Sequence, residues 1–288
     1  MPVAKVNKDV ELYYEDTGTG FPVVFCHEFA GDYRSWEPQV RGFGRLYRCV
    51  TYSQRGFPPS SIPTDPEQYS QELLIEDLRG LLDHLGITRA HLVGFSMGGS
   101  VVLNFGLRYP DLCRSLTVVG AGAGSTNRER FEQDIRHVVD LLRTQGIRRF
   151  AETYAEGPIR TPFKRKDLYG WTVFRDQLAE HSAEGQANTM QGVMLRRPTI
   201  FSLESRLRAL NVPTLVAIGD EDEPCVDVAV FLKRSVPGAG LLVLPQSGHA
   251  INLEEPAIFN AALLEFFRLV EADRWGRRAS VTTGMLPV

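Results

Sequence analysis

The sequence predicts a protein of the α/β class, in which a mostly parallel sheet is covered by helices on both faces. Two observations lead to this prediction. Short apolar runs, of the kind that form strands buried on both faces, alternate along the chain with segments of helical periodicity. The alternation is interrupted once, between about residues 125 and 205, by a stretch that has helical signals and no convincing strand pattern.

Strand patterns dominate the first part of the chain. Residues 10–15 alternate between apolar and polar side chains and run into the turn-prone sequence Thr17-Gly18-Thr19-Gly20, which predicts a hairpin strand with one solvated face. Continuous apolar and β-prone runs predict further strands over residues 21–26, 47–52, 90–93 and 115–119.

Two helices are predicted between these strands. The leucines from Leu74 to Leu85 are spaced so that they share one face of a helix, and Gly86 ends that helix. Residues 101–109 are apolar on most sides and stop at Pro110, so the second helix is expected to be buried. Strand and helix thus alternate, as they do where helices join parallel strands.

The stretch that interrupts this alternation follows a flexible glycine-rich exit over residues 120–124. Apolar residues then recur every three or four positions over residues 131–142 and again over residues 171–178. This spacing predicts two amphipathic helices. We interpret residues 125–205 as a helical cap domain that is inserted into the sheet-containing core.

After the insertion the α/β pattern resumes, so we assign residues 1–124 and 206–288 together to the core. A last helix begins at Pro256, because proline is favoured at the first helical position. The chain after Glu271 has lost this periodicity, which predicts a frayed end. The other elements expected here are strands over residues 213–218 and 241–244 and a helix over residues 227–235.

Composition and charge argue against several kinds of partner. The 288 residues carry 32 Lys and Arg against 35 Asp and Glu, a net charge of −3, which gives no basis for binding nucleic acid or an anionic membrane. The N-terminal residues lack the apolar stretch of a signal peptide, and no run approaches the ~20 apolar residues that span a bilayer. We therefore expect a cytoplasmic protein, monomeric or homodimeric. The four scattered cysteines are expected to be buried free thiols.

The motif Gly94-Phe95-Ser96-Met97-Gly98 carries the first chemical signal. Gly-x-Ser-x-Gly alone recurs by chance, and a plain glycine-rich turn with a solvated serine is the competing interpretation. Its context favours a nucleophile elbow, because the motif follows a predicted strand and precedes a predicted helix. In such an elbow the central side chain is held in a strained, exposed position, while small flanking residues let the backbone pass close by. Ser96 is therefore the candidate nucleophile.

A serine hydroxyl is a poor nucleophile at neutral pH and needs a base, which in turn needs a third group to fix its tautomer. Among the six histidines, His249 suits the role of base best, because it directly follows the predicted strand over residues 241–244. For the acid, Asp220-Glu221-Asp222-Glu223 follows the strand over residues 213–218, at the sheet edge where ligands bind. Four carboxylates in a row leave the choice among them open.

Together these motifs resemble the α/β-hydrolase superfamily, in which serine, acid and histidine follow one another in this order along the chain. The resemblance covers about residues 10–270. Gly219-Asp220-Glu221-Asp222 is similar to the family's Gly-x-x-Asp, which selects Asp222 as the acid, and residues 248–256 are similar to its histidine loop. The resemblance implies an α/β-hydrolase fold with an eight-stranded sheet, and it places the family's cap at residues 125–205.

Two backbone amides are expected to form an oxyanion hole. One belongs to Met97, the residue after the nucleophile. The resemblance assigns the other to Phe29, in the loop that begins at His27. Glu28 departs from the family, which usually has glycine at this position. Its carboxylate either points away and pairs with an arginine, or shapes the polarity of the site and disfavours anionic substrates. Further candidates for the substrate pocket are Trp171, Phe174 and Met190, for each of which simple packing is the competing interpretation.

The sequence thus predicts hydrolysis of a small carboxylic ester, lactone or related acyl compound through Ser96, His249 and Asp222, by an acyl-enzyme and without a metal or other cofactor. An alternative is hydrolysis of a carbon–carbon bond in a dienone or diketone, because some relatives cleave such bonds and their elbow often carries Ser-Met-Gly-Gly, as residues 96–99 do here. However, that group tends to have a glycine-rich oxyanion loop and an aromatic residue after the histidine, and this chain has neither. A cofactor-free peroxidase would use the same triad. An alternative function from another class is that of a receptor that binds a small ligand in the cap pocket.

Overall fold

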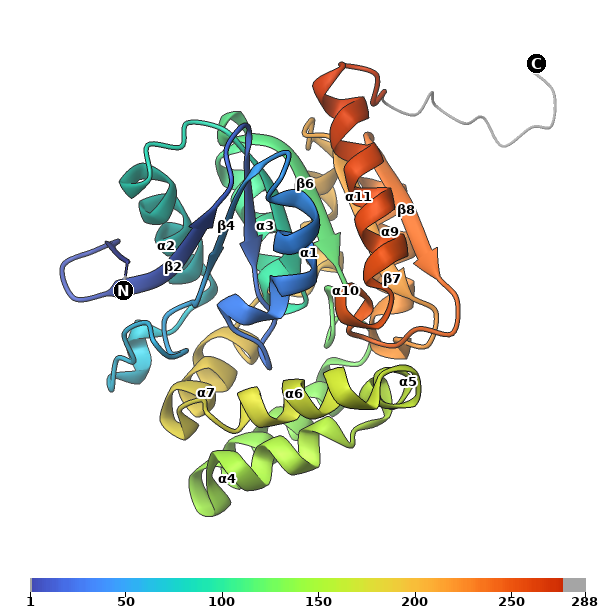
Figure 1. Ribbon diagram of the computed structural model, residues 1–288. Coiled ribbons are helices and arrows are strands. Elements are labelled where there is room, and N and C mark those ends of the chain that lie inside the picture. Colours follow the sequence, from blue (N-terminus) through green and yellow to red (C-terminus); the bar gives the residue numbers. More distant parts are fainter. Residues whose placement is uncertain (1, 277–288) are drawn as a thin grey trace.

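A single eight-stranded sheet organises the computed structural model, which describes residues 2–276 (Figure 1). The strand order across the sheet is β1-β2-β4-β3-β5-β6-β7-β8. From β4 to β8 all neighbouring strands are parallel, whereas β2 is antiparallel to both β1 and β4. The strands are β1 Val3–Lys5, β2 Glu11–Thr17, β3 Pro22–Cys26, β4 Arg48–Tyr52, β5 Ala90–Phe95, β6 Cys113–Val119, β7 Thr214–Gly219 and β8 Ala239–Leu244.

The predicted α/β class and the mostly parallel sheet are confirmed. The residues of β5 and β7 are buried throughout, as expected of strands that are covered on both faces. The sequence did not reveal β1, because three residues are too few to show an alternating pattern. The expected hairpin strand is β2, but the turn at residues 17–20 does not close a hairpin, because β2 pairs with β1 and β4 and the strand after that turn, β3, is not its neighbour.

Helices cover both faces of the sheet (Figure 1). On one face α1 (Glu37–Phe43) and α11 (Pro256–Glu271) pack against each other. On the other face α2 (Gln71–His84) packs on α3 (Met97–Arg108), and α9 (Glu223–Ser235) packs on β7 and β8. All four cysteines are buried and free, as predicted.

The end of α11 corrects one expectation. The chain after Glu271 was expected to be frayed, yet Trp275 folds back onto the sheet edge. Its indole N–H donates a 2.7 Å hydrogen bond to the carbonyl oxygen of Gly238, and its ring meets Phe266 edge-on with centroids 4.6 Å apart. A single aromatic residue that docks through tertiary contacts leaves no periodic signal in the sequence. The remainder of the predicted frayed end, residues 277–288, lies outside the described residues.

Between β6 and β7 the chain forms only helices, which we call the helical insert (residues 128–208). The insert lies across the carboxyl ends of the parallel strands (Figure 1). Its long first helix is kinked at Gly146, where φ is 79°. It occupies the position of the expected cap, whose status as a separate domain over residues 125–205 stays a prediction. Its elements are α4 Arg128–Ala155, η4 Pro158–Arg160, α5 Thr161–Lys166, α6 Leu168–Leu178, α7 Ala183–Thr189, η5 Met190–Met194, η6 Phe201–Leu203 and α8 Glu204–Arg208.

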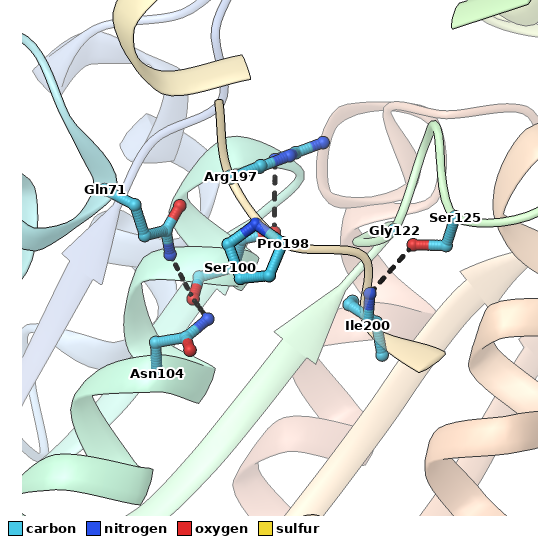
Figure 2. A pocket seen from close by; sticks show the side chains of 8 residues that line it. All are labelled: Gln71, Ser100, Asn104, Gly122, Ser125, Arg197, Pro198 and Ile200. Atoms are coloured by element: carbon cyan, nitrogen blue, oxygen red, sulfur yellow. Dashed lines mark hydrogen bonds between the residues drawn. The ribbon is translucent and has the colours of Figure 1, made fainter. Parts of the chain in front are cut away.

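The returning end of the insert is tied to the helix that follows the candidate nucleophile. The buried Arg197 donates from Nη1 to Ser100 Oγ at 3.2 Å (Figure 2). Its Nη2 donates to the carbonyl oxygen of Ala123 at 3.0 Å. Arg197 and Ser100 also line a small cavity of about 10 Å³, about the space of one water molecule. Arg197 thereby connects the insert to α3 and to the segment that leaves β6.

Candidate active site

Ser96 occupies a tight turn that joins β5 to α3, the context that the sequence motif predicts. Its φ and ψ angles are 54° and −108°, a backbone conformation that residues other than glycine rarely adopt. The Ser96 amide donates a 2.7 Å hydrogen bond to the carbonyl oxygen of Val119 in the neighbouring strand β6. Phe95 and Met97 on either side are buried, whereas Ser96 is partly exposed. The strained turn therefore presents the serine at the carboxyl edge of the sheet.

Gly98 allows this turn to touch the loop after β3. A Cβ atom at Gly98 would lie 2.2 Å from the carbonyl oxygen of Cys26 and 2.6 Å from that of His27, closer than any real Cβ contact. Only glycine permits this approach of two backbones. The start of α3, with the Met97 amide, is therefore held against the loop that carries Phe29, so the two amides expected to form an oxyanion hole lie on adjoining segments.

The candidate base and acid meet directly. His249 follows β8 and Asp222 precedes α9, and the imidazole Nδ1 lies 2.6 Å from Asp222 Oδ2. Asp222 is fully buried, whereas Asp220, Glu221 and Glu223 are exposed. Burial and this contact separate Asp222 from the other three carboxylates of the acidic loop.

The imidazole of His249 also lies beside the elbow. Its centroid is 4.9 Å from that of the ring of Phe95, the residue before Ser96. The sheet explains this proximity, because β5, β6, β7 and β8 are adjacent parallel strands that end at the same edge. Serine, acid and histidine, far apart in sequence, are therefore gathered at one edge of the sheet.

Glu254 is a residue of the site that sequence reasoning did not single out. Its carboxylate accepts hydrogen bonds from the amides of Gly248 at 2.8 Å and Ala250 at 2.9 Å, the two neighbours of His249. Burial raises the pKa of Glu254, and these two hydrogen bonds oppose that rise. Glu254 belongs to the histidine-loop motif over residues 248–256, so the sequence contained this residue without indicating its role. The two hydrogen bonds show that Glu254 fixes the backbone on both sides of His249.

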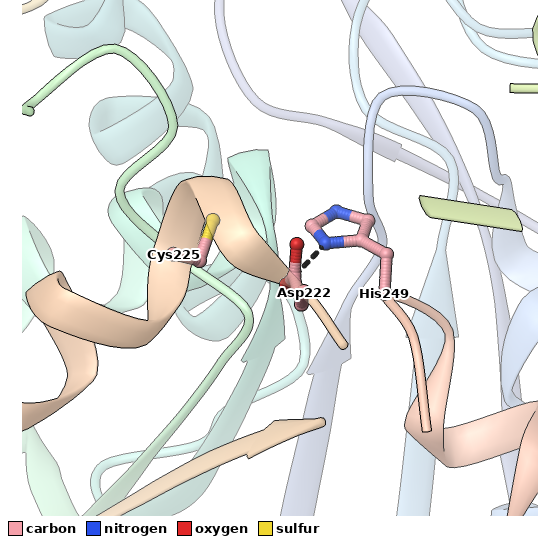
Figure 3. A group of neighbouring side chains, drawn as sticks. All are labelled: Asp222, Cys225 and His249. Carbon is pink, nitrogen blue, oxygen red and sulfur yellow. Dashed lines mark hydrogen bonds and ion pairs between the residues drawn. The ribbon is translucent and has the colours of Figure 1, made fainter. Parts of the chain in front are cut away.

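Cys225 completes a buried cluster with Asp222 and His249, shown in Figure 3. One possible ligand atom from each residue lies within 4.8 Å of the others. Burial raises the pKa of the Cys225 thiol well above its ordinary range, so the thiol is protonated at neutral pH. Metal ions bind the thiolate, and here Nδ1 of the imidazole is already engaged with the carboxylate. The donor set therefore fits a proton-transfer pair better than a metal centre.

Glu28 pairs with an arginine, which was one part of the first expected arrangement. Its carboxylate is buried and pairs with Arg160 of the helical insert, from Nη1 to Oε1 at 2.9 Å and from Nη2 to Oε2. The Arg160 guanidinium lies over the rings of Tyr154 and Phe174, at 5.3 Å and 4.8 Å from their centroids. Glu28 thus joins the loop after β3 to the insert.

The three insert residues proposed for the substrate pocket have different surroundings. The indole N–H of Trp171 donates to the carbonyl oxygen of Ala155 at 2.8 Å, which is packing within the insert. Met190 is buried at the start of η5. Phe174 lies beneath Arg160 and also lines a groove of about 630 Å³ between the insert and the core. Other residues that line this groove are Tyr33, Pro38, Phe163, Val173 and Leu253. Of the three candidates, Phe174 is therefore the one that lines the groove between the helical insert and the core.

The family comparison and the fold define the class of enzyme. The family model of the alpha/beta hydrolase fold matches residues 22–256. The chain belongs to this family and is a hydrolase enzyme, and its eight-stranded sheet confirms the α/β-hydrolase fold.

Several relatives are similar to this chain over most of its length. The putative non-heme bromoperoxidase BpoC of Mycobacterium tuberculosis (strain H37Rv) is 30% identical over 272 residues, 91% of this chain and 100% of that protein. The 2-hydroxy-6-oxo-6-phenylhexa-2,4-dienoate hydrolase of Comamonas testosteroni is 26% identical over 274 residues, 90% of this chain and 92% of that protein. A thermophilic esterase from Thermogutta terrifontis, solved with malate bound, superimposes with a TM-score of 0.83 at 28% identity, over 93% of this chain and 98% of that chain.

The described residues 2–276 contain no helix that is both long and apolar enough to cross a membrane.

Proposed function

We propose that this protein is a serine hydrolase that cleaves a small carboxylic ester or lactone through Ser96, His249 and Asp222. One observation carries the proposal: the strained, partly exposed Ser96 directly follows Phe95, whose ring lies 4.9 Å from an imidazole that is bound through Nδ1 to a buried carboxylate. A nucleophile, a base and a group that orients the base are the minimum that serine catalysis requires. The esterase from Thermogutta terrifontis is a relative of similar fold whose described activity agrees with this reaction.

The proposed chemistry proceeds in two steps. Ser96 Oγ attacks the acyl carbon while His249 Nε2 takes the hydroxyl proton, and that proton then passes to the departing alkoxide. Water, deprotonated by the same imidazole, attacks the acyl-enzyme and releases the acid. In both steps the negative charge on the acyl oxygen is stabilised by the amides of Met97 and Phe29. Losing one donor of an oxyanion hole typically costs ~2.7–4 kcal/mol of transition-state stabilisation.

We also propose that the helical insert acts as the cap of this site. It lies across the carboxyl ends of the strands, and it contacts both the histidine loop and the loop of Phe29: the amide of His249 donates to the carbonyl oxygen of Ile159 at 3.0 Å, and Arg160 pairs with Glu28. A substrate bound at Ser96 would therefore be enclosed between the insert and the sheet edge. A cytoplasmic location and a monomeric or homodimeric state stay predictions.

Labelling with a fluorophosphonate, followed by peptide mass spectrometry, tests the nucleophile. We expect an adduct on Ser96 in the wild-type protein and none in the Ser96→Ala variant, which lacks only the hydroxyl oxygen. A folded wild-type protein that gains no adduct on Ser96 would contradict the proposal.

A hydrolysis screen then tests the bond that is cleaved. It includes acyl-chain esters, lactones and one ring-fission dienone, with the Ser96→Ala variant as the blank. The dienone is included because carbon–carbon hydrolysis is the second candidate, favoured by the dienoate hydrolase of Comamonas testosteroni among the relatives. Turnover of the dienone without turnover of any ester or lactone would replace the first proposal by the second.

A further inference from the structure

The peptide unit between Glu28 and Phe29 contains the N–H proposed to stabilise the oxyanion. Its carbonyl oxygen lies 2.6 Å from His27 Nδ1 and accepts a 3.2 Å hydrogen bond from the Gly31 amide. His27 Nε2 accepts from the Gln54 amide at 2.9 Å, so Nδ1 carries the proton and donates. Because a trans peptide is planar, the direction of the Glu28 carbonyl fixes the direction of the Phe29 N–H. The contacts of His27 and Gly31 with this carbonyl therefore help to aim the donor, and a contact with the Glu28 side chain acts on it through the backbone of the same residue.

The helical insert holds the residues on both sides of this N–H. The Glu28 side chain is gripped by both Nη atoms of Arg160. The Phe29 carbonyl oxygen accepts a 3.2 Å hydrogen bond from Gln186 Nε2, in α7. The loop after β3 is thus attached to two separate elements of the insert, one before and one after the proposed oxyanion donor.

The same short turn of the insert also reaches the histidine loop. Ile159, next to Arg160 in η4, accepts the hydrogen bond from the His249 amide. A Cβ atom at Gly248 would lie 2.5 Å from the Ile159 carbonyl oxygen, so the two backbones are in close contact. One turn of the insert therefore sets the positions of the proposed base and of the proposed oxyanion donor relative to each other.

Stability alone does not require an ion pair at this place. The Arg160 side chain is 0% exposed and that of Glu28 is 2% exposed, so both charges have lost their hydration. An apolar pair of similar volume is often as stable as a buried ion pair, because the desolvation cost offsets the attraction. What an apolar pair does not supply is the planar two-point geometry of a guanidinium on a carboxylate.

We propose that Arg160 is a positioning residue, whose two-point contact with Glu28 orients the Phe29 amide so that a competent oxyanion hole forms when the insert is seated on the core. This inference rests on the proposed serine-hydrolase function. Loss of the contact is expected to lower the rate of the chemical step more than substrate binding, because the Phe29 amide meets its partner charge only in the transition state.

The test compares three variants with the wild type: the double variant Arg160→Met with Glu28→Met, the single variant Arg160→Lys, and the control double variant Arg196→Met with Glu67→Met. The control removes an exposed ion pair between the insert and the core. The readouts are the unfolding temperature, the rate of fluorophosphonate labelling at Ser96, and kcat and KM for an ester that the wild type cleaves.

For the Arg160→Met, Glu28→Met variant we expect an unfolding temperature near that of the wild type, with kcat and the labelling rate ~10- to 100-fold lower and KM little changed. Arg160→Lys keeps the charge without the planar fork, and we expect it to be intermediate. The control is expected to match the wild type in all readouts.

Wild-type kcat and labelling rate in the folded double variant would overturn the inference. If that variant does not fold, wild-type rates in Arg160→Lys would overturn it instead. A wild type that neither labels at Ser96 nor cleaves any ester contradicts the proposed function itself, which distinguishes the two failures.

Discussion

The imidazole Nδ1 of His249 lies 2.6 Å from Oδ2 of Asp222, and both side chains are almost completely buried. Since Nδ1–H is donated to a carboxylate, Nε2 is left without its proton and can accept one from a hydroxyl. The pair therefore fixes the tautomer that a general base needs, and this relationship gives the first prediction.

Asp222→Asn is expected to lower kcat for ester hydrolysis by roughly four orders of magnitude, because an amide donor facing Nδ1 favours the wrong tautomer of His249. The measurement is kcat at saturating ester, together with a thermal unfolding curve. Glu223→Gln, in the same loop but exposed, is the matched control and is expected to retain wild-type kcat. If Asp222→Asn retained wild-type activity, Asp222 would not be the acid of the triad, and another carboxylate of the loop would have to fill that role.

Removal of divalent metal ions is expected to leave activity unchanged. The reason is the chemistry of the cluster of Asp222, Cys225 and His249, in which the thiol is protonated and the imidazole is bound to the carboxylate. Dialysis of the enzyme against EDTA, followed by an assay with and without added Zn²⁺, measures the effect. Loss of activity on dialysis and its return with Zn²⁺ would show that the metal-free mechanism is wrong.

Breaking the buried ion pair between Arg55 and Asp77 is expected to destabilise the folded protein strongly. Arg55 Nη2 donates to Asp77 Oδ1 at 2.6 Å, and both side chains are buried. Asp77→Leu leaves the guanidinium buried without its counter-charge, which typically costs ~3–5 kcal/mol. Denaturant unfolding at pH 7 measures the change. The exposed pair of Arg79 and Asp83 supplies the control, since Asp83→Asn is expected to change the free energy of unfolding by less than ~1 kcal/mol. Equal effects of the two substitutions would contradict the prediction.

Stability is expected to fall as the pH is lowered from about 6.5 to about 4, in part because of His27. Burial lowers the pKa of His27 from 6.5 to about 4. Within this window the unfolded chain binds a proton that the folded protein does not, so the free energy of unfolding rises with pH. A shift of this size corresponds to ~3 kcal/mol. Burial also lowers the pKa of His91, to about 3, which acts in the same direction.

Chemical denaturation at several pH values measures this contribution. His27→Gln removes the titrating group, so the slope of the unfolding free energy between pH 4 and 6.5 is expected to be smaller than in the wild type. His137→Gln, an exposed substitution, is the control and is expected to keep the wild-type slope. An unchanged slope in His27→Gln would show that His27 does not contribute the proton linkage.

Local sequence patterns were sufficient for most of the fold. Buried strands such as β5 and β7 appear as continuous apolar runs, because both of their faces are covered. Amphipathic helices such as α2 appear as periodic leucines, because one face meets the core. The elbow at Ser96 was also readable, because its glycines, its strand and its helix are neighbours in the chain.

Contacts between distant residues could not be predicted in this way. Glu28 and Arg160 are 132 positions apart, and nothing in either segment specifies that the insert brings them together. Trp275 docks on Gly238 for the same reason, which is why the end of the chain was expected to fray. Such contacts depend on the path of the whole chain and leave no periodic pattern.

The sequence by itself therefore determined the α/β architecture, the strand-to-helix turn at Ser96 and the loop of His249, because each of these is encoded by residues that are close together in the chain. The family motif singled out Asp222 among four adjacent carboxylates, but only the tertiary structure decided that this carboxylate is buried against His249 and that Glu28 pairs with Arg160 of the insert. Both outcomes are set by burial and by charge pairing between segments, and these come into existence only when the strands and the insert are packed together.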